Sequence, residues 1–109
     1  MKIAALIPAY NEARAIADVV VRAAPRVAAV YVVDDGSTDG TGELARQAGA
    51  AVVARAANGG KGRALRDGFD RCFADGFDAV VCLDGDGQGR TAAPTATGPN
   101  GNIRAVSPA

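Results

Sequence analysis

Short apolar runs alternate with segments of helical spacing along the first 88 residues. The runs at 2–7, 27–33 and 79–83 consist mainly of Val, Ile, Leu and Ala, and a Pro or an Asp follows each of them. Runs of this length and composition are typical of strands buried on both faces of a sheet. A fourth run at 50–54 is a weaker strand candidate, because alanine is a poor strand former.

Helical spacing fills the gaps between these runs. Two sets of apolar residues follow the i, i+3, i+4, i+7 spacing of one helix face: Ile16, Val19, Val20 and Ala23, then Leu65, Phe69, Cys72 and Phe73. Pro25 and Gly76 end these two patterns. A third helix is predicted at about 41–48, with a cap from Ser37, Thr38 or Asp39 before it and a glycine after it.

The alternation of strands and helices predicts the fold class. It is typical of an α/β fold, an open parallel sheet with helices on both faces and right-handed crossovers. At 109 residues the chain has room for one compact domain, which we place at 1–88. Residues 89–109 contain three prolines, and their apolar residues follow neither the helical nor the strand period, so we interpret them as a flexible tail.

Composition excludes several classes of function. Twelve acidic and twelve basic residues balance, which leaves no basic footprint for nucleic acid or an anionic membrane. Histidine is absent, which excludes a Ser-His-Asp triad and the common His-containing zinc sites. Cys72 and Cys82 lack metal or disulfide spacing, so we expect reduced core thiols and a cytoplasmic location. No apolar run reaches the length of a membrane span.

Polar clusters follow three of the four predicted strands. They are "PAYNE" at 8–12, "DDGSTDG" at 34–40 and "DGDGQ" at 84–88. Ligands of open α/β sheets bind beyond the carboxyl ends of the strands. Each cluster alone is also compatible with ordinary turn chemistry, because Asp, Gly and Asn are common turn formers. Three clusters at one edge of a sheet favour a ligand site there.

The last cluster has the donor atoms of a metal site. Asp84 and Asp86 end the fourth predicted strand, and two neighbouring carboxylates repel each other unless a cation lies beside them. Hard oxygen ligands suit Mg²⁺ or Mn²⁺, with phosphate oxygens completing the shell. An EF-hand is excluded, because the bidentate Glu at its twelfth position is replaced by Arg46 or Thr95.

The stretch "NGGKG" at 58–62 is a glycine-rich turn before a helix. It is not a P-loop, because Arg55 takes the place of the first glycine and Gly62 follows Lys61 where Ser or Thr is needed. The residues "PAYNEA" after the first strand also lack a dinucleotide fingerprint. The backbone N–H groups and the Lys61 ammonium would serve near a diphosphate, although a solvated lysine at a helix start fits equally well.

Four motifs in order and spacing resemble the N-terminal half of a family 2 glycosyltransferase with the GT-A fold. They are "IPAYNE", "VVDDGSTDGT", "NGGKGRALRDGF" and "VVCLDGDGQ". Within this family the chain resembles bacterial enzymes related to polyprenyl-phosphate sugar transferases. The resemblance covers residues 1–88 and implies a strand order of about 3-2-1-4.

The resemblance also implies roles for particular residues. The base and ribose of a nucleotide-sugar would lie against Pro8, Tyr10 and Glu12, and the base also against Val33 and Asp35. The cation and the sugar diphosphate would lie at the family's DxD motif, here Asp84, Gly85 and Asp86, with Gln88 as a further metal ligand. The implied donor is a UDP- or GDP-sugar, and the implied acceptor is polyprenyl phosphate or another glycan.

The chain departs from the family pattern after Gln88. Relatives continue with His, whereas Gly89 and Arg90 follow here, and 89–109 show no counterpart of the acceptor site or of the acidic general base. We therefore expect a fragment or a lost reading frame, with no sugar transfer by these residues alone. The alternatives are a non-catalytic nucleotide-binding module, an unstable fragment, or a Rossmann-like protein with structural loops. The apolar fourth strand lacks an expected neighbour, which predicts self-association through its edge.

Overall fold

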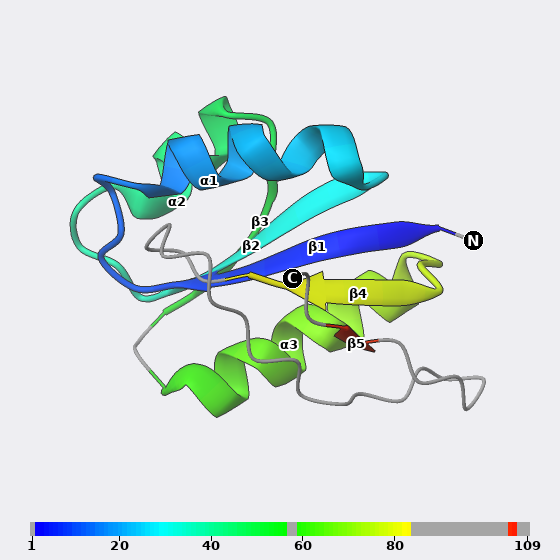
Figure 1. Cartoon of the computed structure of the whole chain (residues 1–109). Helices are drawn as coiled ribbons and strands as arrows, with labels where there is room; N and C mark the ends of the chain where they lie inside the picture. Colours follow the sequence, from blue (N-terminus) through cyan, green and yellow to red (C-terminus); the bar gives the residue numbers. More distant parts are fainter. Residues whose placement is uncertain (1, 57–58, 84–104, 107–109) are drawn as a thin grey trace.

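The computed structural model describes residues 2–56, 59–83 and 105–106. Strands and helices alternate along the chain (Figure 1). In order, the elements are β1 (Ile3–Ala9), α1 (Ile16–Ala23), the short 3-10 helix η1 (Ala24–Arg26), β2 (Ala29–Asp35), α2 (Thr41–Gln47), β3 (Ala51–Arg55), α3 (Lys61–Ala74), β4 (Ala79–Cys82) and β5 (Ala105–Val106). All four predicted strands and all three predicted helices are confirmed, including the alanine-rich β3.

The strands form one parallel sheet in the order β3-β2-β1-β4-β5. The predicted order 3-2-1-4 is therefore confirmed. The expectation that nothing covers β4 is wrong at two residues, because Val80 pairs with Ala105 and Val81 with Val106. Self-association through this edge stays a prediction, as does the domain boundary at 88, which lies outside the described residues.

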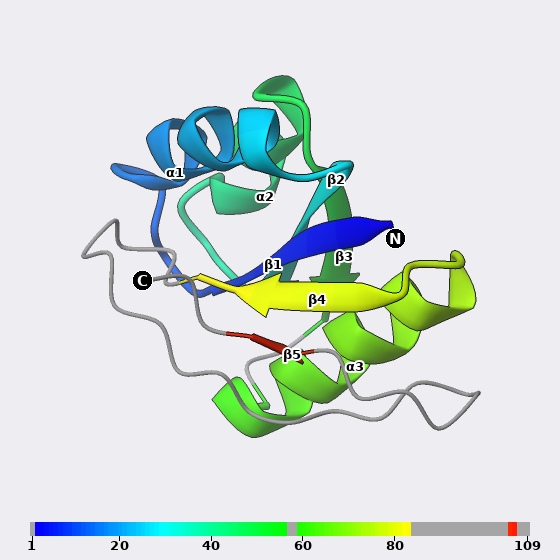
Figure 2. The same cartoon turned by 45° about the vertical axis from the view of Figure 1, so that its right-hand side comes forward.

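Helices cover both faces of the sheet, as predicted. α1 and α2 pack on one face and α3 on the other, and two views of the ribbon agree on this arrangement (Figures 1 and 2). Side chains alternate along each strand, so Ala5 and Ile7 of β1 join the core under α1 and α2, while Ala4 and Leu6 join the core under α3. Both faces of the central strands are apolar for this reason.

β1 continues past the proline that was expected to end it. Leu6 accepts a hydrogen bond from the N–H of Leu83 (3.0 Å), so alternate residues of β1 direct their backbone groups toward β4. The pairing with β4 ends at Leu6, whereas the pairing with β2 continues to Ala9. Pro8 faces the same side as Leu6, beyond the last residue of β1 that pairs with β4. Its missing N–H therefore removes no hydrogen bond of this pairing.

A glycine lets α3 approach the sheet closely. A Cβ at Gly68 would lie 2.5 and 2.8 Å from the two methyl carbons of Leu6 and 2.8 Å from Cγ2 of Val33. Leu6 and Val33 are fully buried. This contact sets the distance between α3 and the two central strands.

Polar contacts anchor the other end of α3. The Tyr31 hydroxyl donates a hydrogen bond to Oδ2 of Asp75 (2.6 Å), and Nε of Arg71 donates to the same oxygen (2.9 Å). Burial, followed by this bond to Asp75, raises the pKa of Tyr31 above its ordinary value. The hydrogen bond from Tyr31, followed by that from Arg71, lowers the pKa of Asp75. The start of β2 is thereby tied to the end of α3.

Both cysteines are buried, as predicted, and neither forms a disulfide. Both belong to the core between the sheet and α3. Burial, followed by the nearby Asp75 carboxylate, raises the pKa of the Cys72 thiol to about 12. Within the described part of the chain, no helix has the length and apolar character needed to cross a membrane.

Candidate functional site

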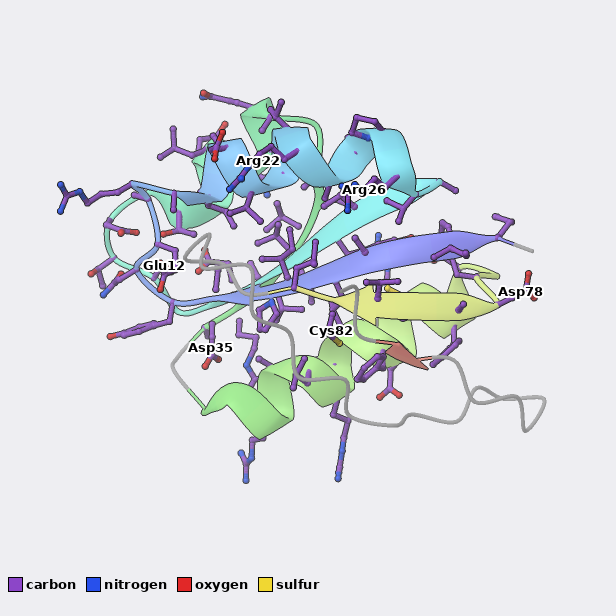
Figure 3. All side chains as sticks on the ribbon, in the orientation of Figure 1. Glu12, Arg22, Arg26, Asp35, Asp78 and Cys82 are labelled. Atoms are coloured by element: carbon purple, nitrogen blue, oxygen red, sulfur yellow. The ribbon has the colours of Figure 1, made fainter. Side chains whose placement is uncertain are left out.

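The carboxyl ends of β1, β2 and β3 bring three connecting segments to one edge of the sheet. Glu12 and Asp35 lie at this edge, whereas Asp78 lies at the opposite end of the sheet (Figure 3). α3 runs back along the sheet, so its first residue, Lys61, begins at the same edge (Figure 1). We call this region the carboxyl edge, formed by residues 8–13, 34–41, 55–56 and 59–61.

Hydrogen bonds fasten the segment after β1 to the segment after β2. The bonds between them include Asn11 N to Ser37 Oγ (2.9 Å), Glu12 N to Thr41 Oγ1 (2.9 Å), Ala13 N to Asp39 Oδ2 (3.1 Å), Thr38 N to Asn11 Oδ1 (2.9 Å) and Thr38 Oγ1 to Asn11 Oδ1 (3.4 Å). Asn11 has a left-handed φ of 52°, which asparagine tolerates better than most residues. Tyr10, just before this turn, keeps 45% of its surface exposed.

Thr41 and Asp39 hold the start of α2. The buried Thr41 hydroxyl accepts from Glu12 and donates to Asp39, whose carboxylate also accepts from the N–H of Thr41 (3.1 Å). The hydrogen bond from the Thr41 hydroxyl lowers the pKa of Asp39. The residue before the helix is Gly40, with φ of 87°, and it forms no side-chain cap, so the predicted cap from Asp39 acts one residue further out.

Asp35 is the most buried carboxylate of the carboxyl edge. It is 4% exposed, and its oxygens accept from Nε of Arg55 (2.7 Å) and from the N–H groups of Gly59 and Gly60 (3.2 Å each). Nη1 of Arg55 makes a second ion pair, with Asp67 of α3. Asp35 therefore joins the end of β2 to the end of β3 and to the turn before α3.

The residues predicted to contact the nucleotide differ in how much of their surface is exposed to solvent. Pro8 and Glu12 are half-buried, and Tyr10 is exposed. Val33 is fully buried in the core under α3, with its Cγ2 against Gly68, which leaves a contact between its side chain and a base an untested prediction. Of Lys61 the structure describes the backbone, which begins α3, and not the side chain.

The predicted metal ligands Asp84, Asp86 and Gln88, together with Gly85, lie outside the described residues. Within residues 2–56, 59–83 and 105–106, no group of three or more His, Cys, Asp or Glu is arranged to hold a metal ion. A metal site at this edge therefore rests on the DxD motif.

Neither Arg55 nor Asp67 was among the predicted site residues, although both belong to the ion pairs around Asp35. Arg55 ends β3 and so falls at the same edge as Asp35, a position that the strand pattern alone already indicated. Asp67 is on α3, and nothing in its spacing indicated the ion pair.

The parallel sheet, the helices on both of its faces and the polar carboxyl edge define an open α/β protein. Proteins of this class bind their ligands at the carboxyl ends of the strands. The model of the family "Glycosyl transferase family 2" matches residues 4–90, so this chain belongs to glycosyl transferase family 2.

Curated relatives agree with this assignment. The chain is 47% identical over 83 residues to the glycosyltransferase AglJ of Haloferax volcanii, and the match covers 75% of the chain and 26% of the relative. It is 40% identical over 86 residues to the protein RfbJ of Shigella flexneri, covering 77% of the chain and 64% of the relative. The chain thus spans about a quarter of the first relative and less than two thirds of the second.

Solved structures show the same fold. The chain is similar to glucosyl-3-phosphoglycerate synthase from Mycobacterium tuberculosis in complex with Mn²⁺, UDP and glucosyl-3-phosphoglycerate, with a TM-score of 0.64 and 34% identity. The match covers 77% of this chain and 33% of the synthase. The same enzyme in complex with Mg²⁺ and UDP gives the same values. This is a GT-A glycosyltransferase fold.

Proposed function

We propose that the chain forms the donor-binding part of a glycosyltransferase that transfers a sugar from a UDP- or GDP-sugar with the help of Mg²⁺ or Mn²⁺. The observation that carries the proposal is the likeness to glucosyl-3-phosphoglycerate synthase, whose solved complexes hold UDP with Mn²⁺ or Mg²⁺. The acceptor is polyprenyl phosphate or another glycan, and the reaction takes place in the cytoplasm.

The carboxyl edge supplies groups for a nucleotide. The exposed ring of Tyr10 is available for stacking on a base or ribose. The Glu12 carboxylate is an acceptor suited to ribose hydroxyls, and its backbone is held by Thr41. Asp35 fixes the turn before α3, where Lys61 begins the helix and its ammonium suits a diphosphate.

The donor set for the cation fits Mg²⁺ or Mn²⁺. The Leu83 N–H bonds to Leu6, so the β4 pairing continues up to the residue before Asp84. The carboxylates of Asp84 and Asp86 and the amide of Gln88 are hard oxygen ligands, which these cations prefer. When bound, the cation neutralises charge on the leaving nucleoside diphosphate.

Calorimetric titration of UDP and of GDP, with and without Mn²⁺, tests the proposal. We expect one nucleotide to bind more tightly with the metal, and the metal to bind more tightly with that nucleotide by the same factor. Asp86→Asn should remove most of this coupling. Asp70→Asn, at an exposed position of α3, is the matched control and should leave the coupling unchanged. Equal nucleotide affinity with and without Mn²⁺, in a sample that circular dichroism shows to be folded, would overturn the proposal.

We further propose that the 109 residues alone bind the donor without transferring its sugar. The support is the coverage, because the chain corresponds to 33% of the synthase. An acceptor site and a general base are both needed for efficient transfer. Product formed from UDP-glucose by the purified chain, and lost in Asp86→Asn, would contradict this.

A further inference from the structure

We propose that Arg55, supported by Asp67, is a positioning residue for the nucleotide. It acts through the Asp35 carboxylate on the Gly59–Gly60 turn and does not itself touch the ligand. The part of this proposal that concerns the nucleotide rests on the proposed function, whereas the part that concerns the turn rests on the geometry alone.

One guanidinium joins two acids from different elements. Its Nε donates to Oδ1 of Asp35 on β2 (2.7 Å), and its Nη1 pairs with Oδ2 of Asp67 on α3. The side chain of Arg55 is 17% exposed, that of Asp35 is 6% exposed and that of Asp67 is 46% exposed. A buried carboxylate needs such a counter-charge, and a planar fork with several N–H donors can satisfy two carboxylates at once.

Arg55 keeps Asp35 able to accept hydrogen bonds. An ionised carboxylate only accepts, and Asp35 accepts from both Gly59 and Gly60 through its two oxygens. Without the guanidinium, this buried carboxylate would lose its charge partner and face Asp67 across the same space. Displacement of Asp35 would then release the two glycine N–H groups.

The turn also packs directly on the guanidinium. A Cβ at Gly59 would clash with Nη2 of Arg55, so any side chain there would displace the guanidinium. Gly60 has a left-handed φ of 93°, which glycine adopts without strain. The Arg55 guanidinium thus packs against Gly59, while the Asp35 carboxylate accepts hydrogen bonds from the N–H groups of Gly59 and Gly60.

The turn decides where α3 begins relative to the rest of the carboxyl edge. Gly60 is the residue before the helix, and Lys61 is its first residue. Asp35 continues β2 just past Asp34, which pairs with Ala9 at the end of β1. A turn released from Asp35 would shift the start of α3 away from the segment that carries Tyr10 and Glu12. The expected result is weaker nucleotide binding without loss of any direct contact.

The experiment compares the full chain with Arg55→Lys, using two measurements. Lysine keeps the positive charge, but its single ammonium cannot pair with both Asp35 and Asp67 and also pack against Gly59 as the guanidinium does. We expect amide hydrogen exchange at Gly59 and Gly60, followed by NMR, to become about 10-fold faster, because hydrogen bonds to a charged group are lost. We expect the affinity for UDP with Mn²⁺ to fall by about the same factor. Exchange in β1 should stay as in the parent chain.

Two further variants separate positioning from general stability. Arg22→Lys is the matched control, because Arg22 also pairs with an aspartate but at the surface of α1, with side chains 64% and 69% exposed (Figure 3). It should change neither measurement. Asp67→Asn removes the support of Arg55 and should speed exchange at Gly59 and Gly60 by a smaller factor. In the Arg55→Lys background Asp67→Asn should add nothing, because Asp67 acts through Arg55.

The two measurements have distinct consequences. Unchanged exchange at both glycines in Arg55→Lys overturns the proposal, and so does faster exchange with unchanged UDP affinity. If the parent chain binds neither UDP nor GDP, the proposed function fails, while the exchange rates still decide whether Arg55 positions the turn. If Arg55→Lys does not fold, the exchange rates of Asp67→Asn decide the same question.

Discussion

Gly68→Ala tests how closely α3 packs on the sheet. The added methyl would lie 2.5 Å from one methyl carbon of Leu6 and 2.8 Å from the other, and 2.8 Å from Cγ2 of Val33. Neither neighbour can turn away into solvent, because both are fully buried. The helix must therefore move outward or the two side chains must leave their rotamers.

The magnitude follows from two opposing effects. Overpacking a buried contact costs about 1–3 kcal/mol. Alanine returns up to about 1 kcal/mol, because it is a better helix former than glycine. Since both neighbours are fully buried, we expect a net loss of about 1–2 kcal/mol in the free energy of unfolding.

Gly62→Ala is the matched control on the same helix. No atom lies within 4 Å of a Cβ at Gly62, and its φ is not positive. Here only the helix propensity changes, so this variant should gain up to about 1 kcal/mol. Urea denaturation followed by far-UV circular dichroism measures both variants against the parent chain. A Gly68→Ala chain as stable as Gly62→Ala would refute the argument from close packing.

Two further predictions concern the polar anchor and the buried thiol in the core under α3. Tyr31→Phe should lower Tm at neutral pH, because Asp75 loses its hydrogen bond. The pKa of Asp75 is lowered from 3.8 in the folded chain, so the ionised carboxylate stabilises the fold above about pH 4 and this stabilisation is lost as the pH falls further. The difference in Tm between the parent chain and Tyr31→Phe should therefore shrink at acid pH. The pKa of Cys72 is raised from 9.0 to about 12, so its contribution is full below pH 9 and is lost as the pH rises toward 12. Cys72→Ala should therefore flatten the alkaline decline in stability by up to about 1.4 kcal/mol per pH unit.

Thermal melts across pH check the first of these predictions, and urea titrations between pH 8 and 10 check the second. A Tyr31→Phe difference that stays constant into strong acid would mean that the hydroxyl does not act through the ionised Asp75. An alkaline slope that is identical in the parent chain and Cys72→Ala would mean that the thiol ionises equally well in the folded state.

Much of the fold was accessible from the pattern of apolar residues. The helical spacing from Ile16 to Ala23 predicted α1 with the same first and last residues as in the structure, because a surface helix must present one apolar face. The start of α3 at Lys61 was indicated by the glycine-rich turn at 58–62 and not by periodicity, since Gly62 and Arg63 are exposed and the apolar pattern begins only at Leu65. The strand order came from the family resemblance, because hydrophobic periods do not encode which strands are neighbours.

The sequence by itself determined the α/β class, the polar carboxyl edge and the family to which the chain belongs, because these depend on the order of short local patterns. It also named Asp35 as a site residue, through the family resemblance. Only the tertiary structure decided what the Asp35 carboxylate does, because its partners Arg55 and Gly59 are far along the chain and meet it only after β2, β3 and α3 have packed. The role of Gly68 has the same origin: a missing side chain has no pattern of its own, and its effect exists only where two packed surfaces meet.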